Sequence, residues 1–502
     1  MSSPTLIGID IGTSSTKTAV LSAEGRVLAV ASEEYAVEVP HPGWAEQAPE
    51  TWVRAAATTL QRSLVDAGVA PASVAGISFS GQMHGTVCVD ADGLRLRPAI
   101  IWADQRSGAQ VRDVVERLGK ARLAAWTSNP LATGFMLASW LWLREHEPET
   151  VRAMRWLLLP KDYVRYRLTG EIGTEPSDAS STSLFSPALR GWSVPLLEEL
   201  GLARDVLPEV FDSTAVAGQL LPGFAAEVGL PAGTPVVFGG SDQAVQALGN
   251  GVVAPGVVSS TIGTGGQLLA PTRGCVVDPE LRMHSFCHVQ QDLWHVETAM
   301  LSAGLSLRWL RDQVLDGMTY RAMADAAAAV PAGADGLLFQ PYLAGERTPH
   351  MDPRARGSFI GLTRRHGRAH LIRAAMEGVV FGMREGLDVM LGLGVPVDEI
   401  VGSGGATRHP LWLHLQADIY NRPIQRTRTT EAAAVGAAML AGIGTGVFDD
   451  VTDAISRVVR RHDEVVLPNP ARVDVYASQY EVFCALYPAL VNVVHELGQI
   501  SA

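Results

Sequence analysis

One carboxylate stands directly before a turn of small residues near the start of the chain. Asp10 lies at the end of an apolar run, and Gly12-Thr13-Ser14-Ser15 follows. Residues 16–21 then read as a second strand, so the turn closes a β-hairpin. Backbone N–H groups of such a turn can point at a phosphate, and Gly12 has no Cβ to block its approach. Asp10 would then face the phosphate or its metal ion; a plain strand with a tight turn fits the residues equally well.

A second turn of this kind occurs about half a chain later. A β-branched run at 257–262 ends in Gly263-Thr264-Gly265-Gly266, and an apolar run resumes at 267–269. Neither turn is followed by a helix, which argues against both a Walker loop and a dinucleotide fingerprint. The repeat suggests a duplicated domain. Two facing hairpins would grip the phosphates of one nucleotide from opposite sides, which is an arrangement for phosphoryl transfer.

Other polar side chains follow expected strands, where open α/β sheets place ligands. His84 follows the strand 74–79, Asp104 follows 98–102, and Asp242 follows 235–238. An ordinary hydrogen-bonded loop residue is the alternative for His84 and for Asp104. Asp242 opens a small-residue helix, so it is either an N-cap or a proton acceptor for a substrate hydroxyl, and the two roles are compatible.

Two further stretches are weaker signals. The glycine turn 402–406 precedes a helix near residue 410, which suits the phosphate or ribose edge of a nucleotide. Residues 284–288 hold two histidines and a cysteine, but no second cluster completes a tetrahedral metal set. A strand with a packing role is the interpretation of 284–288.

The elements that must position these residues form an α/β layer architecture. Three antiparallel strands up to residue 31 are followed by helices. The expected helices are 49–67, 140–147, 160–168, 302–310, 432–441 and 473–497. A chain of 502 residues exceeds what one hydrophobic core usually serves, so two domains are expected, with the crossing at 247–255.

The composition limits the classes of binding partner and the cellular compartment that we expect. The chain has 40 basic and 52 acidic residues and a net charge of −12, which argues against nucleic-acid and membrane-surface partners. Four scattered cysteines suit reduced thiols in the cytoplasm. No signal peptide is expected at the N-terminus. The most membrane-like window, 432–447, is short and is expected to be a buried helix.

Several motifs together resemble the FGGY carbohydrate kinases over nearly the whole chain. Gly-Gln-Met-His-Gly at 81–85 is similar to the sugar-site motif of the members that act on D-xylulose, and the runs 159–163, 284–288 and 342–350 are also similar to that subgroup. The run 357–362, with His370, Leu371 and 374–377 downstream, resembles the C-terminal signature of the family.

The resemblance implies an actin-like ATPase fold, in which two ribonuclease-H-like domains (1–247 and 248–502) flank a cleft. It also implies ATP, Mg²⁺ and transfer of the γ-phosphoryl group to O5 of a ketopentose, D-xylulose. The catalytic base would be Asp242, and the residue that organises the metal and the phosphates would be Asp10. The implied sugar-binding residues are Met83, His84, Asp104, Asp242 and Gln243; the implied nucleotide-binding residues are Gly12, Thr13, Gly263, Thr264, Gly404, Gly405 and Ala406.

The chain departs from the family pattern at three places. Ala138-Ser139 stands where Pro-Lys is usual, Gln243 where Asn is frequent, and Gly265 where Ser is usual. A kinase for ribulose, gluconate or a glycerol-like polyol is therefore one alternative. A non-catalytic ATP-binding module like actin or the heat-shock chaperones is the other, but it would leave the sugar motif without a use. A homodimer is a further hypothesis.

Overall fold

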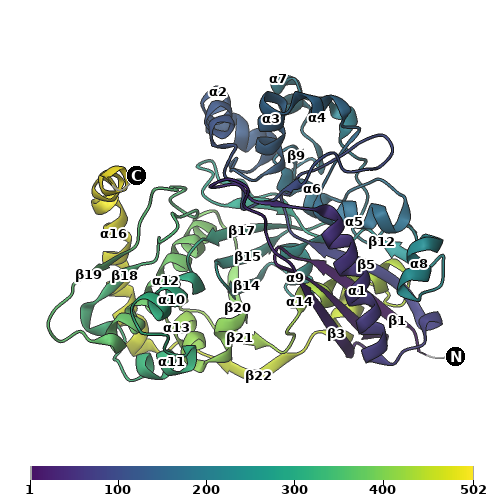
Figure 1. Cartoon of the computed structure of the whole chain (residues 1–502). Helices are drawn as coiled ribbons and strands as arrows, with labels where there is room; N and C mark the ends of the chain where they lie inside the picture. The colour runs from purple at the N-terminus through teal and green to yellow at the C-terminus, as the bar shows by residue number, and fades with distance from the viewer. Residues whose placement is uncertain (1–2, 501–502) are drawn as a thin grey trace.

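The computed structural model describes residues 3–500, which fold around two sheets that stand side by side (Figure 1). The path through the first sheet is β11-β12-β5-β1-β2-β3. Its strands are β1 (Thr5–Ile11), β2 (Ser15–Ser22), β3 (Val27–Glu34), β5 (Val74–Gly81), β11 (Val216–Gln219) and β12 (Pro235–Val237). β1, β2 and β3 are antiparallel, β5 and β12 run parallel to β1, and β11 is an antiparallel edge.

The second sheet repeats this pattern. Its order is β16-β17-β15-β14-β20-β21-β22. The strands are β14 (Gly256–Ile262), β15 (Gly266–Thr272), β16 (His284–Cys287), β17 (Trp294–Met300), β20 (Val397–Ser403), β21 (Ile424–Thr427) and β22 (Arg461–Val466). β14, β15 and β17 are antiparallel, β20 and β21 run parallel to β14, and β22 is antiparallel. Apart from the additional edge strand β16, the order and directions match those of the first sheet, so the predicted duplication and both hairpins are confirmed.

Helices extend each half. A helical lobe stands over the first sheet, at the top of Figure 1, and contains α2 (Gly108–Thr127), α3 (Met136–His146), α4 (Pro148–Ala153) and α7 (Val194–Leu200). Below the lobe, α5 (Pro160–Thr169) packs in the apolar cluster of the first sheet, and α6 (Pro176–Ala179) contacts β16 of the second. The second half carries α10 (Gly304–Gln313), α11 (Tyr320–Ala328), α12 (Arg368–Gly392), α13 (Pro410–Tyr420) and α16 (Pro470–Ile500). The first-half helix α1 (Pro49–Ala67) matches the prediction residue for residue, because Pro49 begins it and the left-handed Gly68 ends it.

The two halves exchange a helix each. α14 (Ala432–Gly444), from the second half of the sequence, packs in one apolar cluster with Leu6 and Leu21 of the first sheet. α9 (Asp242–Gly249), from the first half, packs through Ala247 on Leu269 and Val401 of the second sheet. A Cβ on Gly8 would lie 1.9 Å from the carbonyl oxygen of Ala434, so α14 touches the strand backbone. The membrane-like window is thus the predicted buried helix, and packing crosses the predicted domain boundary.

Some predicted boundaries are wrong. The strand expected at 98–102 is only β7 (Ala99–Ile100), paired with β4 (Glu46–Gln47) at the end of an expected loop. The helices expected from 140 and 302 begin at Met136 and Gly304, because the apolar pattern extends across their true ends. All four cysteines are free thiols. Between residues 3 and 500, no helix has the length and apolarity to cross a membrane.

Candidate active site

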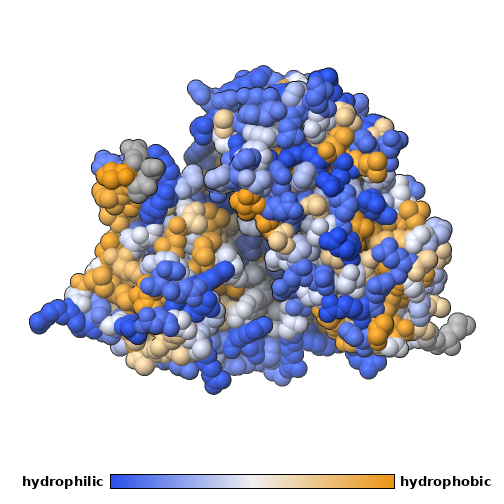
Figure 2. All heavy atoms as spheres, in the orientation of Figure 1, coloured by the Kyte–Doolittle hydropathy of each residue, from blue (hydrophilic) through white to orange (hydrophobic). Residues whose placement is uncertain are grey.

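The space-filling view shows a hollow between the two halves of the molecule (Figure 2). The predicted residues of the first half lie at or just beyond the ends of β1, β5 and β12, and the second turn follows β14. Asp10 and Ser80 lie opposite each other on β1 and β5, and the Ser80 hydroxyl donates to Asp10 Oδ1 over 2.8 Å. Burial raises the pKa of Asp10, while the Ser80 hydrogen bond and the charge of Lys17 oppose the rise. Within residues 3–500, no donor hydrogen-bonds to the second carboxylate oxygen of Asp10, so this oxygen is available to a ligand.

Asp242 is the first residue of α9. The N-cap is Ser241, and no side chain caps this helix, so the capping role considered for Asp242 is wrong. Asp242 Oδ1 is buried and has no hydrogen-bond partner among the described residues. Burial, followed by the charges of Asp10 and Glu297, raises the pKa of Asp242 well above its usual range. A carboxylate of raised pKa with a free oxygen is a competent proton acceptor.

His84 has a defined protonation state. Its Nδ1 lies 2.7 Å from the carbonyl oxygen of Ser181, which can only accept, so Nδ1 carries the hydrogen. Burial lowers the pKa of His84 to about 3, which keeps the ring neutral. Nε2 therefore offers a lone pair. The ring stacks on Phe135 with the ring centroids 3.8 Å apart, and the φ angle of His84 is 72°, in the left-handed region that histidine adopts more often than most residues.

The other predicted sugar residues differ in their surroundings. Met83 is buried beside His84, and Gln243 follows Asp242 and is half-buried. Asp104 is buried, and its carboxylate already accepts from Arg106 and from the Ala45 N–H, each over 2.7 Å. These contacts match the loop-residue alternative for Asp104. A sugar contact would have to displace one of them.

A buried network behind the site was missed by the sequence reasoning. Lys161 Nζ lies 2.7 Å from Asp162, 3.3 Å from Asp178 and 3.4 Å from Glu175, and all four side chains are fully buried. Burial alone would lower the pKa of Lys161, but the charges of the carboxylates raise it above its usual range. The signal in the sequence is the charged pair Lys161-Asp162, which stands inside an apolar run. A helix is predicted at 160–168, but no role is assigned to this pair from the sequence.

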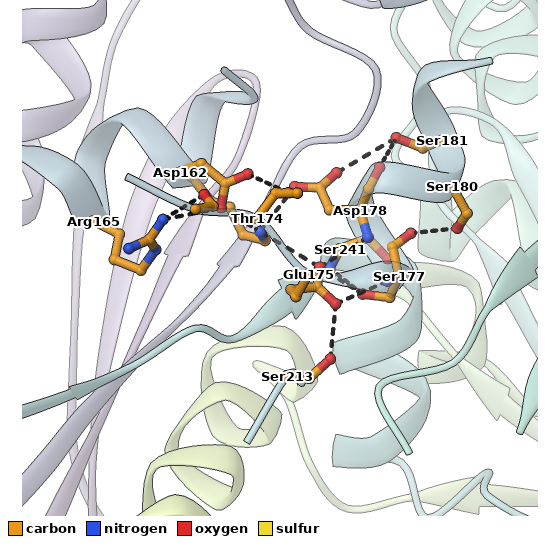
Figure 3. A network of polar contacts seen from close by, with 12 residues as sticks. Asp162, Arg165, Thr174, Glu175, Ser177, Asp178, Ser180, Ser181, Ser213 and Ser241 are labelled. Atoms are coloured by element: carbon orange, nitrogen blue, oxygen red, sulfur yellow. Dashed lines mark hydrogen bonds and ion pairs between the residues drawn. The ribbon is translucent and has the colours of Figure 1, made fainter. Parts of the chain in front are cut away.

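Ser177, Ser181 and Ser241, which Figure 3 shows in the network, connect it to both predicted sugar-site residues. The Ser177 hydroxyl donates to Glu175 over 2.9 Å and accepts from the N–H of Ser241, the residue before Asp242, also over 2.9 Å. The Ser181 hydroxyl accepts from the His84 N–H over 3.2 Å and donates to the carbonyl of Asp178 over 2.7 Å. Asp242 and His84 are thus positioned by one rigid cluster.

On the other side of the hollow, the second half contains a cavity of about 780 Å³. Its lining includes four of the predicted nucleotide residues, together with apolar and basic side chains: Gly263, Thr264, Gly405, Ala406, Leu307, Met376, Trp412, Arg308 and Arg408. Arg308 donates to the Thr264 hydroxyl over 3.0 Å. The size of this cavity, its apolar walls and its two arginine side chains suit a nucleotide.

The remaining predicted nucleotide residues lie outside that lining. Gly12 and Thr13 form the β1–β2 turn of the first half, where the Thr13 hydroxyl donates to Gln82 over 3.1 Å and accepts from Trp102 over 2.8 Å. Gly404 has a φ of 83°, and a Cβ there would lie 2.7 Å from the carbonyl oxygen of Ile262, so it brings the strand end close to the second turn.

The structure gives reasons for two of the departures. A Cβ on Gly265 would lie 2.7 Å from the carbonyl oxygen of Met300, which excludes serine at this turn. Ala138 and Ser139 are buried inside α3 in the helical lobe, so a lysine at this point would lie in an apolar core. No lysine of α3 serves the site.

Asp10 is also the predicted metal ligand. Among residues 3–500, no group of three His, Cys, Asp or Glu side chains could hold a metal ion by itself. Mg²⁺ usually keeps several waters and binds one or two carboxylates together with substrate phosphates. The free oxygen of Asp10, next to the first turn, fits that mode of binding.

Comparison with known proteins identifies the class. The models of the N-terminal and C-terminal domains of the FGGY family of carbohydrate kinases match residues 5–249 and 258–445. The chain therefore belongs to the FGGY family of carbohydrate kinases, and its two duplicated domains form the actin-like fold that the resemblance implied. It is a sugar kinase, with ATP and a sugar as substrates.

Individual relatives are similar over their full length. The chain is 36% identical to the xylulose kinase of Bacillus subtilis (strain 168), over 96% of each chain. The crystal structure of xylulose kinase from Rhodospirillum rubrum superimposes with a TM-score of 0.90 at 31% identity, covering 98% of this chain and 100% of that one. The gluconokinase of Bacillus subtilis is 31% identical over 91% of each chain.

Proposed function

We propose that this kinase phosphorylates D-xylulose at O5, with Asp242 as the catalytic base. The observation that carries the proposal is the pair of unsatisfied acceptors at the sugar site, Asp242 Oδ1 and the neutral His84 Nε2. The full-length similarity to xylulose kinases supports the choice of sugar. The division into domains 1–247 and 248–502, a cytoplasmic location and a homodimer remain predictions.

The proposed mechanism needs alignment and charge stabilisation more than covalent chemistry. Asp242 accepts the proton of the O5 hydroxyl as that oxygen attacks the γ-phosphorus, and ADP leaves with the bonding electron pair. His84 accepts a hydrogen bond from another sugar hydroxyl, beside Met83 and Gln243. Gly12, Thr13, Gly263 and Thr264 hold the phosphates from two sides, and Gly404, Gly405 and Ala406 hold the adenosine side.

Mg²⁺, bound through Asp10 and the phosphates, would neutralise charge on the β- and γ-phosphates. Closing the hollow between the halves would exclude water, the competing phosphoryl acceptor. Asp104 would act through the loop that it holds with Arg106, or would exchange one of its present donors for a sugar hydroxyl.

The test is a panel of acceptors in a coupled ADP-release assay. D-Xylulose should give a higher kcat/KM than D-ribulose, D-gluconate or glycerol. A higher value for any of those three would overturn the choice of sugar and leave the kinase assignment standing. His84→Ala should raise KM for the sugar and leave KM for ATP nearly unchanged, because a neutral hydrogen bond contributes about 0.5–1.5 kcal/mol.

A further inference from the structure

Two ionisable side chains of the second half face the sugar site without a role in the proposed mechanism. Glu297 lies on β17, and Arg347 lies in the loop after β18 (Leu338–Gln340). This loop is fixed beside β17, because the Thr348 N–H donates to the Ala299 carbonyl over 3.0 Å. Arg347 lies in the run 342–350, which resembles a motif of the family but has no chemical role assigned to it from the sequence.

Neither charged side chain has a hydrogen-bond partner among the described residues. The Glu297 side chain is 6% exposed, and its Oε2 is buried with no partner among residues 3–500. The guanidinium of Arg347 donates no hydrogen bond to any described residue either; its interactions with Glu297 and Glu346 are purely electrostatic. Buried polar groups are nearly always satisfied, so the unsatisfied Oε2 of Glu297 indicates that a substrate supplies its partner. Arg347 is half-buried, so its guanidinium is open to the same substrate.

Several contacts place this pair at the acceptor site. Glu297 is the β16–β17 register partner of His284, whose ring lies 5.7 Å from Phe135. Phe135 in turn stacks on His84. Cys287 of β16 donates its N–H to Ser180 of the buried network over 3.1 Å, which joins this edge of the second sheet to the helical lobe.

The electrostatics agree with this placement. After burial and the charge of Asp10, the charge of Glu297 is a further cause of the raised pKa of Asp242. Burial lowers the pKa of His84, and the charge of Arg347 lowers it further. These effects agree with the pairing of Glu297 with His284 across β16 and β17 and with the hydrogen bond that fixes the Arg347 loop beside β17. With a sugar bound beside His84, Glu297 and Arg347 would form the wall of the acceptor site that the second half contributes.

The pair has opposite charges, and this bears on which sugars can bind. A lone arginine in this wall would attract a sugar carboxylate through a bidentate charge-assisted contact. Glu297 and Glu346 both act electrostatically on Arg347 and offset its charge, and an incoming carboxylate would be repelled by Glu297. The same family contains a gluconokinase relative, so the scaffold accommodates both kinds of acceptor.

We propose that Glu297 and Arg347 bind the acceptor sugar, and that Glu297 restricts the site to uncharged sugars. Glu297 accepts a hydrogen bond from a sugar hydroxyl and balances the charge of Arg347, while Arg347 donates to sugar oxygens. The proposal rests on the proposed function for the position of the sugar, but it does not depend on which neutral sugar is preferred.

The experiment compares kcat/KM for D-gluconate with kcat/KM for the neutral sugar that the wild type phosphorylates best. Glu297→Gln keeps the shape of the side chain and removes its charge. The neutral sugar should lose about 10–100-fold, as expected for a hydrogen bond to a charged group. The gluconate-to-neutral-sugar ratio should rise at least about tenfold, by the combined loss of that bond and of the repulsion.

Two further variants keep the test decisive. Arg347→Met leaves Glu297 uncompensated, so the ratio should fall by about tenfold or more through loss of the charge-assisted donor. Glu385→Gln is the matched control, because this buried carboxylate accepts from Tyr342 in the same loop over 2.9 Å and is no cause of the Arg347 pKa shift. Its ratio should stay at the wild-type value.

A ratio that is unchanged in both Glu297→Gln and Arg347→Met would overturn the inference, provided that thermal melts show folded proteins. If one variant does not fold, the other decides by the same ratio. A wild type that prefers D-ribulose or glycerol would overturn the proposed sugar and leave this inference open to the same measurement, so the two failures are distinguishable.

Discussion

At equivalent points of the two sheets, the first half carries a charge and the second carries a hydroxyl. Asp10 of β1 is hydrogen-bonded to Ser80 of β5 over 2.8 Å, whereas Thr261 of β14 is hydrogen-bonded to Ser403 of β20 over 2.7 Å. The backbone is the same in both places. Under the proposed function, the duplicated frame would supply two phosphate turns, and the difference between Asp10 and Thr261 would give one of them a carboxylate for a metal ion.

The exchanged helices show a similar contrast. Each follows the second parallel strand of its half, and each begins at a carboxylate. Glu431, before α14, forms an ion pair with Lys17 at 2.6 Å, whereas Asp242, at the start of α9, has a free buried oxygen. Glu431 is already bound to a cation, whereas Asp242 Oδ1 has no partner among residues 3–500, so of the two it is Asp242 that is open to a substrate hydroxyl.

The largest expected effect separates these two carboxylates. Asp242→Asn should lower kcat by about 10²–10⁴-fold, the usual contribution of a positioned proton acceptor. Glu431→Gln should leave kcat within a few-fold of the wild type. Steady-state kinetics on both variants provide the measurement, and equal losses in the two would remove the contrast.

Asp242→Asn should not destabilise the protein. A carboxyl whose folded-state pKa is raised binds its proton more tightly when folded, so its ionisation at neutral pH costs stability. The thermal midpoint of this variant should therefore equal or exceed that of the wild type at pH 7. A large fall would mean that the loss of activity reflects unfolding.

The next effect concerns the metal. Asp10→Asn should weaken the apparent affinity for Mg²⁺ by about 10–100-fold, the range typical of residues that support a metal site. Thr261→Val, the change at the equivalent point of the other half, should leave it unchanged. Rates across a Mg²⁺ titration show whether the metal depends on the first half alone.

A smaller effect is expected in the pH profile. The pKa of Asp242 is raised, so kcat/KM should fall as the pH decreases through that pKa and the base becomes protonated. Glu297→Gln removes one of the charges that raise it, so the acid limb should move to lower pH. Burial raises the pKa of Glu297 itself to about 7, so discrimination against D-gluconate should weaken below pH 7 in the wild type. If the acid limb of Glu297→Gln is the same as that of the wild type, the charge of Glu297 does not act on Asp242.

The smallest effect tests the hydroxyl pair of the second half. Thr261→Val removes the hydrogen bond to Ser403 and should cost about 0.5–1.5 kcal/mol of unfolding free energy, with kcat nearly unchanged. Chemical denaturation measures the loss. A fall in kcat comparable with that of Asp10→Asn would show that the two halves contribute alike.

Much of the fold could be predicted from local patterns in the sequence. β-Branched runs with Gly-Thr turns gave both hairpins, and capping residues gave α1, because these signals lie within a few residues of the elements that they define. The exchange of α9 and α14 could not be predicted, since it depends on contacts between residues such as Gly8 and Ala434 that are far apart in the chain.

The same distinction between local signals and distant contacts applies to the site. Asp10, His84 and Asp242 stand at strand ends, a position that the sequence reveals. The partners of Asp104, the Lys161 network and the unsatisfied Glu297 depend on which side chains meet in three dimensions. The N-cap of α9 was missed by one residue, because Ser241 and Asp242 are both favourable capping types.

The helix exchange also bears on how the protein is made. The first sheet is synthesised early, but the apolar face that holds Leu6 and Leu21 is covered by α14, which ends at Gly444. At typical translation rates of about 5–20 residues per second, the ribosome needs roughly 20–90 s to reach that point. The domain that begins first therefore finishes late, and its sheet is exposed to aggregation or chaperone binding until nearly the whole chain has emerged.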